Sequence, residues 1–464
     1  TTADGRVHAA EKHPPGLYVL FATEMWERFA FYSMLAMFTL YLQDTTEGFS
    51  WTDARATTLY SNYLMFVYFS PLVGGWIADR KLGFRNSVLI GGVFLGIGNA
   101  LIAQGTVSMM YAGITSMIIG NGFFKPNVSA MVGALYPEGS RLKDRAYNIF
   151  YMGINIGAFV APLVAEAVRQ RYGFREAYFV AAAGMVVSIA ILWFFRRHVD
   201  HADSRHKAPT PASSVAATSV DAPPKSISRQ QDALEAVPEG RRIMALIVIF
   251  LIVIVFWMVF HQNGSTLTYW ANDNTDWASS TVLPVIIRIL TLGFVSGDDV
   301  SGVISNAINP FWIITLTFPL VWFWKWLDKR NMEPSTPTKM AIGMFLTAIS
   351  FYILYFAAAA GGDTGRVSPW WLIGAYFVIS LGELMLSPMG LSLVSKVAPI
   401  RFRGLMMGGW FAATAIGNKL TQIGVYWNVW KHSTFFAVLG TMALVMAVVL
   451  VILLKPLKKS MPGV

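Results

Sequence analysis

Long apolar segments recur along the whole chain and are separated by short polar loops. A helix of about twenty apolar residues rises about 30 Å, which is enough to cross the hydrocarbon core of a bilayer. The pattern therefore predicts an all-α membrane protein with twelve transmembrane helices. We expect these helices over residues 17–42, 55–78, 86–105, 109–134, 146–168, 175–196, 242–270, 303–327, 338–360, 369–395, 402–427 and 433–455.

The stretch from His198 to Gly240 breaks this pattern. It is rich in proline, serine, alanine and charged residues and contains no apolar run, a composition typical of flexible linkers. It leaves six predicted spans on either side. We therefore expect an N-terminal six-helix bundle over residues 1–197, a flexible cytoplasmic linker over 198–240 and a C-terminal six-helix bundle over 241–464.

Charge alternates from loop to loop. Basic residues gather in one set of loops, such as residues 80–85 and 455–459, and acidic residues such as Asp44 and Asp273 lie in the opposite set. The positive-inside rule then places the basic loops and both termini in the cytoplasm. These loops account for the formal charge of +10 without a nucleic acid partner.

Composition agrees with this interpretation. Only 13% of residues are charged, whereas soluble domains have about 25%. The chain contains no cysteine, which excludes a disulfide framework and thiol catalysis.

The loop after the second predicted span resembles a motif of the major facilitator superfamily. Residues 74–83 combine a glycine-rich helix end with Asp79 and two basic residues, and residues 327–330 form the equivalent loop of the second half. Asp79 can hold a neighbouring helix end, so we expect it to take part in gating. The resemblance implies a major facilitator fold, with its site near the membrane midplane between two repeats.

Three ionisable residues lie within the first predicted span. Each charge near a bilayer centre costs roughly 2.5–3.5 kcal/mol on insertion scales, so Glu24, Glu27 and Arg28 need partners. Glu24 and Arg28 are one helical turn apart, and Glu27 lies on nearly the same face. The three residues can pair inside a protein-lined cavity, and two carboxylates that share one arginine can store a proton. A static buried ion network is the structural alternative.

Other polar residues lie within predicted spans. Counting along the helices places Lys125, Asn155 and Glu383 about 13–18 Å from the cytoplasmic end, in one layer with the first-span cluster. The same count places His261 about 30 Å in, near the outer face, where a histidine that titrates near neutrality could act as a pH-sensitive outer gate. Helix packing and snorkelling to the interface remain alternatives for each residue.

Several segments together resemble the proton-dependent oligopeptide transporter (POT) family. They are Glu24-Met25-Trp26-Glu27-Arg28-Phe29, Phe123-Phe124-Lys125-Pro126-Asn127, Asp144 through Phe150-Tyr151 to Asn155-Ile156-Gly157, Asn309-Pro310, Gly382-Glu383 to Ser387-Pro388, and Gly409-Trp410-Phe411. The resemblance covers nearly the whole chain outside the linker and the termini. It implies import of di- and tripeptides by alternating access in the inner membrane of a bacterium. Protons would be the coupling ion, no cofactor would be needed, and we expect the protein to act as a monomer.

The resemblance also implies roles for individual residues. Proton coupling would involve Glu24, Glu27, Arg28, Lys125 and Glu383. Substrate binding would involve Arg28, Tyr32, Tyr68, Lys125, Asn155, Trp257, Asn309, Glu383, Ser387 and Trp410. Arg28, Lys125 and Asn155 would receive the carboxyl end of the peptide, and Asn309 and Glu383 its amino end. We also expect Lys125 to pair with Glu383 across the two bundles when the cytoplasmic side is closed.

The sequence departs from the family pattern near the first-span cluster. Phe31 stands where the family usually has a tyrosine, and Leu35 and His261 replace an arginine and an acid that face each other in many members. The outer gate therefore cannot be transferred from the family.

A carrier of nitrate, amino acids or drugs could use the same fold. A membrane-embedded hydrolase is disfavoured because the chain has no HExxH or GxSxG motif and no cysteine. A nutrient sensor that does not transport is disfavoured because the linker offers no signalling domain.

Overall fold

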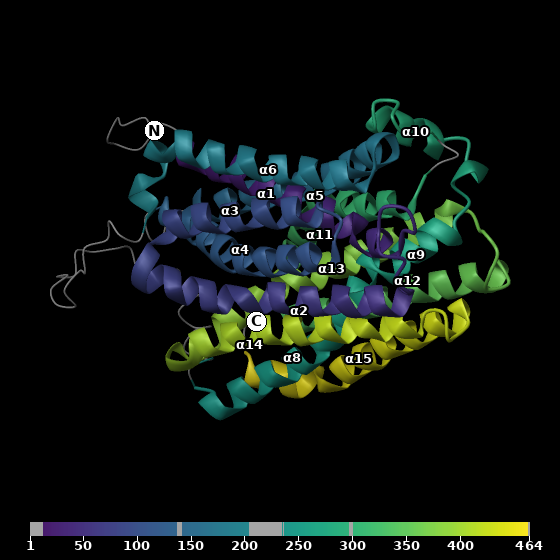
Figure 1. The fold of residues 1–464 in the computed structure, drawn as a ribbon. Coiled ribbons are helices and arrows are strands. Elements are labelled where there is room, and N and C mark those ends of the chain that lie inside the picture. The colour runs from purple at the N-terminus through teal and green to yellow at the C-terminus, as the bar shows by residue number, and fades with distance from the viewer. Residues whose placement is uncertain (1–12, 137–141, 204–233, 235, 297–299, 463–464) are drawn as a thin grey trace, which may run out of the picture.

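Helices make up nearly all of the described structure (Figure 1). The computed structural model describes residues 13–136, 142–203, 234, 236–296 and 300–462. The first half contains α1 (Pro15–Gln43), α2 (Asp53–Ile77), α3 (Phe84–Ile102), α4 (Val107–Ala134), α5 (Leu142–Tyr172) and α6 (Phe174–Phe194). The second half contains α8 (Glu239–Phe260), α9 (Thr266–Asp273), α10 (Leu283–Leu290), α11 (Ile308–Asp328), α12 (Thr336–Ala360), α13 (Pro369–Val397), α14 (Arg403–Leu420) and α15 (His432–Ser460).

Each predicted span has a long helix at its position, so the all-α membrane fold is confirmed. Within the described residues, nine helical segments are long and apolar enough to cross a membrane by length and composition alone. The helices α1, α2 and α14 are not among them. Polar side chains within α1 and α2 lower their mean hydropathy, and α14 ends early at Leu420.

Some predicted boundaries are wrong. The predicted span 242–270 is interrupted, because α8 ends at Phe260 and a 3-10 turn over His261–Gly264 leads into α9. Likewise, α14 gives way to a 3-10 segment over Thr421–Tyr426. Gly264 at the end of this turn lets Tyr60 approach closely, because a Cβ at this position would collide with the Tyr60 hydroxyl.

Most of the predicted linker, residues 204–233 and 235, lies outside the described residues. Its beginning is packed against α3. Arg85 forms an ion pair with Asp200, and the backbone N–H of Phe84 donates to Asp203 Oδ1 at 2.9 Å. The division into two bundles joined by a flexible linker stays a prediction.

Glycine positions bring α2 and α4 into backbone contact. A Cβ at Gly74 would collide with the carbonyl of Gly122. Pro126, four residues further along α4, has no N–H to donate to that carbonyl. The close packing of α2 on α4 places Tyr68 of α2 beside Lys125 of α4.

The two halves meet along α2 with α14 and along α5 with α11. In Figure 1, α2 lies directly beside α14, and α5 lies near α11 in the middle of the molecule. Residues on these four helices can therefore reach across the junction between the halves.

Candidate functional site

The first-span cluster is a compact, buried ion network on α1. Arg28 Nε lies 2.5 Å from Glu27 Oε2, and Arg28 Nη2 donates to Glu27 Oε1 at 2.8 Å. Glu24 Oε1 lies 3.2 Å from Arg28 Nε. The second oxygen of Glu24 is buried without a hydrogen-bond partner. The Arg28 guanidinium thus pairs with two carboxylates, and one oxygen of Glu24 has no hydrogen-bond partner.

Lys125 lies close to this cluster but forms its contact with an aromatic ring. Its Nζ is 4.4 Å from the centroid of the Tyr68 ring, a cation–π geometry. Arg28, Glu24 and Glu27 lie within electrostatic range of Lys125. The structure therefore brings Arg28 and Lys125 into one region of the first half.

Glu383 lies in the second half, on α13. Its Oε2 accepts a hydrogen bond from Asn309 Nδ2 of α11 at 3.0 Å, and the same amide donates to Ser380 Oγ at 2.9 Å. Ser387 is half-buried one helical turn beyond Glu383, on the same face of α13. Sequence reasoning assigned Asn309 and Glu383 to one end of the substrate, and the structure brings them together.

The charged groups of the two halves are not paired with one another, but two tyrosines of the first half approach the carboxylate of the second. Tyr32 and Tyr68 of the first half lie within electrostatic range of Glu383. Lys125 and Glu383 are both described, and no ion pair within 4.0 Å joins them. We call Glu24, Glu27, Arg28, Tyr32, Tyr68, Lys125, Asn309 and Glu383 the central layer. Its cations belong to one half, and a carboxylate belongs to the other.

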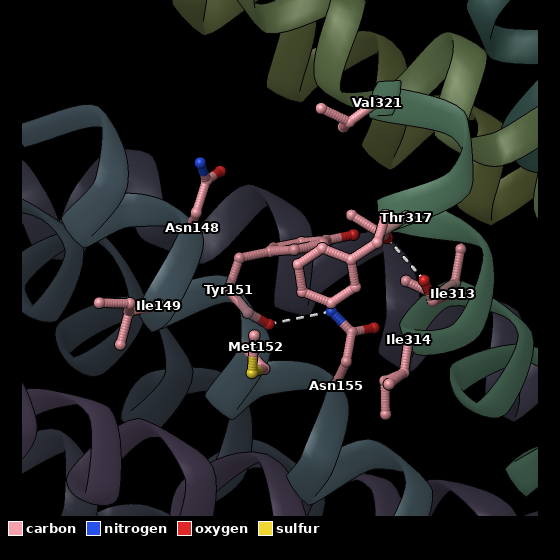
Figure 2. A pocket seen from close by; sticks show the side chains of 10 residues that line it. Asn148, Ile149, Tyr151, Met152, Asn155, Ile313, Ile314, Thr317 and Val321 are labelled. Atoms are coloured by element: carbon pink, nitrogen blue, oxygen red, sulfur yellow. Dashed lines mark hydrogen bonds between the residues drawn. The ribbon is translucent and has the colours of Figure 1, made fainter. Parts of the chain in front are cut away.

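Asn155 borders a pocket between α5 and α11, at the junction of the halves. The pocket has a volume of about 270 Å³. Figure 2 shows Tyr151 and Asn155 of α5 opposite Ile313 and Thr317 of α11. The Asn155 amide donates to the backbone carbonyl of Tyr151 at 2.9 Å. Tyr151 lies within electrostatic range of Glu383, so the pocket adjoins the central layer.

Trp257 and Trp410 are buried rather than exposed to lipid. The exposed fractions of their side chains are 7% and 3%. The Trp410 ring packs against Gly390 of α13, where a Cβ would collide with it. The Trp257 ring centroid lies 5.1 Å from that of His261. Neither residue is therefore part of an aromatic belt at the membrane surface.

The predicted depth of His261 is wrong. Residue counting placed it near the outer face, beyond the layer of Lys125, but its ring centroid lies only 5.8 Å from that of Tyr68, whose ring contacts Lys125. A tilted helix covers less depth per residue than an upright one, and α8 runs obliquely to its neighbours in Figure 1. His261 borders the central layer, and its gating role stays a prediction. The side chain of Asp79 lies outside the described residues; its backbone belongs to a π-helical turn, Ala78–Leu82.

Hydrogen bonds between the halves cluster at one end of the molecule. This is the end that the alternating charge of the loops places on the outer side of the membrane. Tyr60 donates to the backbone carbonyl of His261 at 3.3 Å, and Thr39 donates to that of Gly264 at 3.1 Å. Further bonds of this kind join Thr57 to Tyr269, Thr58 to Gln422, Asp53 to Asn428 and Glu166 to the backbone N–H of Ser301. We call this set, together with the lysine bond described next, the outer interface.

Lys419 contributes a cation to the outer interface. Its Nζ lies 2.5 Å from Asn62 Oδ1 of the first half and 2.5 Å from Gln422 Oε1 of the second. The sequence interpretation missed this residue, although it lies within the predicted span 402–427. An ionisable residue inside a span is the signal that would have found it.

The described residues contain no group of three or more His, Asp or Glu side chains that could hold a metal ion.

Comparison with known proteins gives consistent matches. The sequence profile described as the POT family matches residues 85–230 and 297–441. The chain is 31% identical to a di-/tripeptide transporter of Lactococcus lactis subsp. cremoris, over 97% of each chain. It is also 31% identical to the uncharacterized transporter YclF of Bacillus subtilis, over 97% of this chain and 96% of that one.

A solved structure shares the fold. The crystal structure of a peptide transporter POT in complex with sulfate superposes with a TM-score of 0.83 at 27% identity, over 98% of this chain and 97% of that one.

Proposed function

Because the chain belongs to the POT family of membrane transporters, we propose that it imports di- and tripeptides together with protons. The relative from Lactococcus lactis is named for di-/tripeptide transport, which supports this substrate class. The bacterial relatives and the basic loops support a location in the cytoplasmic membrane with both termini in the cytoplasm. The protein is a transporter and not an enzyme.

The distribution of charge in the central layer carries this proposal. Arg28 and Lys125 belong to the first half, Glu383 belongs to the second, and they are not paired with one another. A peptide with free ends is a zwitterion. Its carboxylate fits the two cations and its ammonium group fits Glu383, so the peptide itself can join the two halves. Charge-assisted hydrogen bonds are roughly twice as strong as neutral ones, which favours this arrangement.

The ion network on α1 offers a link between proton and peptide. Arg28 is held by Glu27 and Glu24, so a peptide carboxylate must compete with them for the guanidinium. A proton on Glu24, whose second oxygen is unpaired, would weaken that competition. Protonation would thus prepare Arg28 for the peptide, and deprotonation toward the cytoplasm would favour release.

The outer interface fits an alternating-access cycle. Its hydrogen bonds hold the outer ends of the halves together while the peptide leaves toward the cytoplasm. Opening to the outside requires these bonds to break. The pocket beside Asn155 would accept a peptide side chain, because it is lined mainly by apolar groups.

Transport by proteoliposomes tests the proposal. Purified protein is reconstituted, and a labelled dipeptide is supplied with an imposed proton gradient, acidic outside. We expect accumulation that collapses with a protonophore and that unlabelled tripeptides inhibit. Inhibition by nitrate or free amino acids instead of peptides would assign the protein to another substrate class.

A variant pair tests the coupling step. Glu24→Gln should retain exchange of peptide between the two sides but lose accumulation driven by the gradient. The exposed Glu176 provides a matched control, because Glu176→Gln removes a carboxylate on α6 that faces outward. Normal gradient-driven accumulation in Glu24→Gln would remove this residue from the coupling scheme.

A further inference from the structure

The short helix α10 and the turn that follows it present apolar side chains outward. Arg288 is the only charged residue of α10. Ile287 packs inward, whereas Ile289 is 67% exposed and Leu292 is 85% exposed. Val282, Val285, Ile286, Leu290 and Phe294 are exposed as well. A contiguous apolar surface of this kind marks a contact with a membrane or another molecule.

The position of α10 indicates which contact this is. In Figure 1, α10 lies at the periphery of the helix bundle, at the end that holds the outer interface. A groove of about 250 Å³ separates it from α5, α11 and α13. Ile286, Leu290, Phe311 and the half-exposed Trp370 are among its lining residues. Tryptophan is enriched at the boundary between bilayer and water, so Trp370 places α10 at the level of the outer lipid head groups.

The apolar surface continues on both sides of α10. A second groove lies between the turn after α10 and α5, and it is lined by Leu163, Tyr172, Leu292 and Phe294. Along α11, Phe311 in the groove and Trp322 nearer the membrane interior are exposed. The grooves beside α10 are therefore continuous with the faces of α5 and α11 that the bilayer covers.

We propose that α10 and the following turn, residues 283–294, form an interfacial anchor embedded in the outer leaflet. Lipid acyl chains occupy the two grooves beneath it, and the exposed Arg288 faces the lipid phosphates. A helix with one apolar face and a basic residue binds at the interface in this way, and a guanidinium pairs well with phosphate. The segment thereby fixes the outer end of the second half at a constant depth in the membrane.

Site-specific fluorescence quenching tests the anchor directly. The chain contains no cysteine, so Ile289→Cys and Leu292→Cys each create a single labelling site in the full-length protein. Thr364→Cys is the matched control, because Thr364 is exposed in the polar loop between α12 and α13 at the same end of the molecule. An environment-sensitive fluorophore is attached at each site, and the proteins are reconstituted with and without lipids brominated on the acyl chains.

Bromine quenches only fluorophores that reach the acyl-chain region. We expect quenching at residues 289 and 292 to be at least about three times that at residue 364, because an interfacial helix buries its apolar face among acyl chains. The two positions report independently, and Leu292 has almost no contacts to lose on substitution. Equal quenching at all three positions would overturn the proposal. Quenching at 289 and 292 that falls as the protein-to-lipid ratio rises would also overturn it, in favour of a second copy of the chain covering this face.

Discussion

The two halves of the protein meet in different ways at the outer interface and in the central layer. At the outer interface, neutral groups, the carboxylates of Asp53 and Glu166, and Lys419 form hydrogen bonds from one half to the other. In the central layer, Arg28 is satisfied within the first half and Glu383 within the second. The outer ends are thus joined by the protein itself, whereas the centre has complementary charges that a substrate can join. This difference is the physical basis of the proposed cycle.

The largest effect is expected from removing the arginine of the central layer. Arg28→Gln should lower peptide uptake roughly 100-fold, because a hydrogen bond to a charged group contributes roughly 1.5–3 kcal/mol and the two buried carboxylates lose their cation. Initial rates of proteoliposome uptake give the measurement. Arg175→Gln, at an exposed arginine of α6, serves as the control. Uptake within twofold of wild type in Arg28→Gln would show that the cluster on α1 is only structural.

Removing the negative charge of the second half should have a smaller effect. Glu383→Gln keeps a side chain of similar size that can still accept from Asn309, but it loses the attraction for the peptide ammonium group. We expect the affinity for dipeptides to fall about tenfold, which corresponds to about 1.4 kcal/mol. Binding measured by calorimetry or thermal stabilisation provides the readout. An unchanged affinity would place the amino end of the peptide elsewhere.

Weakening the outer interface should change the conformational equilibrium more than the affinity. Lys419→Met removes the bonds to Asn62 and Gln422, and we expect the outward-open population to rise roughly fivefold, about 1 kcal/mol. A cysteine at the buried Ser61 reports this opening through its rate of labelling by an impermeant maleimide added outside. Lys431→Met, at an exposed lysine, is the matched control. Equal labelling rates would show that Lys419 does not stabilise the closed outer end.

The smallest effect is expected at His261, which lies between the two regions. Its ring contacts Tyr68 of the central layer, and its backbone carbonyl accepts from Tyr60 of the outer interface. The charged neighbour in electrostatic range of the imidazole is Lys125. If the imidazole is the pH-sensitive element, His261→Gln shifts the pH profile of uptake while the maximal rate stays within about twofold of wild type. A profile identical to that of wild type would exclude it.

The sequence predicts contacts within one helix well, because helical periodicity fixes them. Glu24 and Arg28 are one turn apart, and the structure joins them as the spacing requires. Contacts between helices depend on tilt and on breaks in the helices. Counting residues along α8 therefore misplaced His261. No periodic pattern in the sequence predicts the hydrogen bond from Tyr60 to the backbone carbonyl of His261 across the junction of the halves.

Two features lay beyond the sequence interpretation for different reasons. Lys419 stood within a predicted span and could have been identified as an intramembrane charge. The helix α10 is only eight residues long and too short to span a membrane, so a search for spans passes over it. Its apolar face can be interpreted as a membrane contact only once the structure places α10 at the outer edge of the bundle.

The central claim is that a peptide joins Glu383 of one half to the cations of the other. It is tested most directly by comparing a free dipeptide with its N-acetylated form in wild type and in Glu383→Gln. Acetylation removes the positive charge that Glu383 would bind. We predict that it lowers affinity about tenfold in wild type, about 1.4 kcal/mol, and has little effect in Glu383→Gln. An equal loss of affinity in both proteins would contradict the claim.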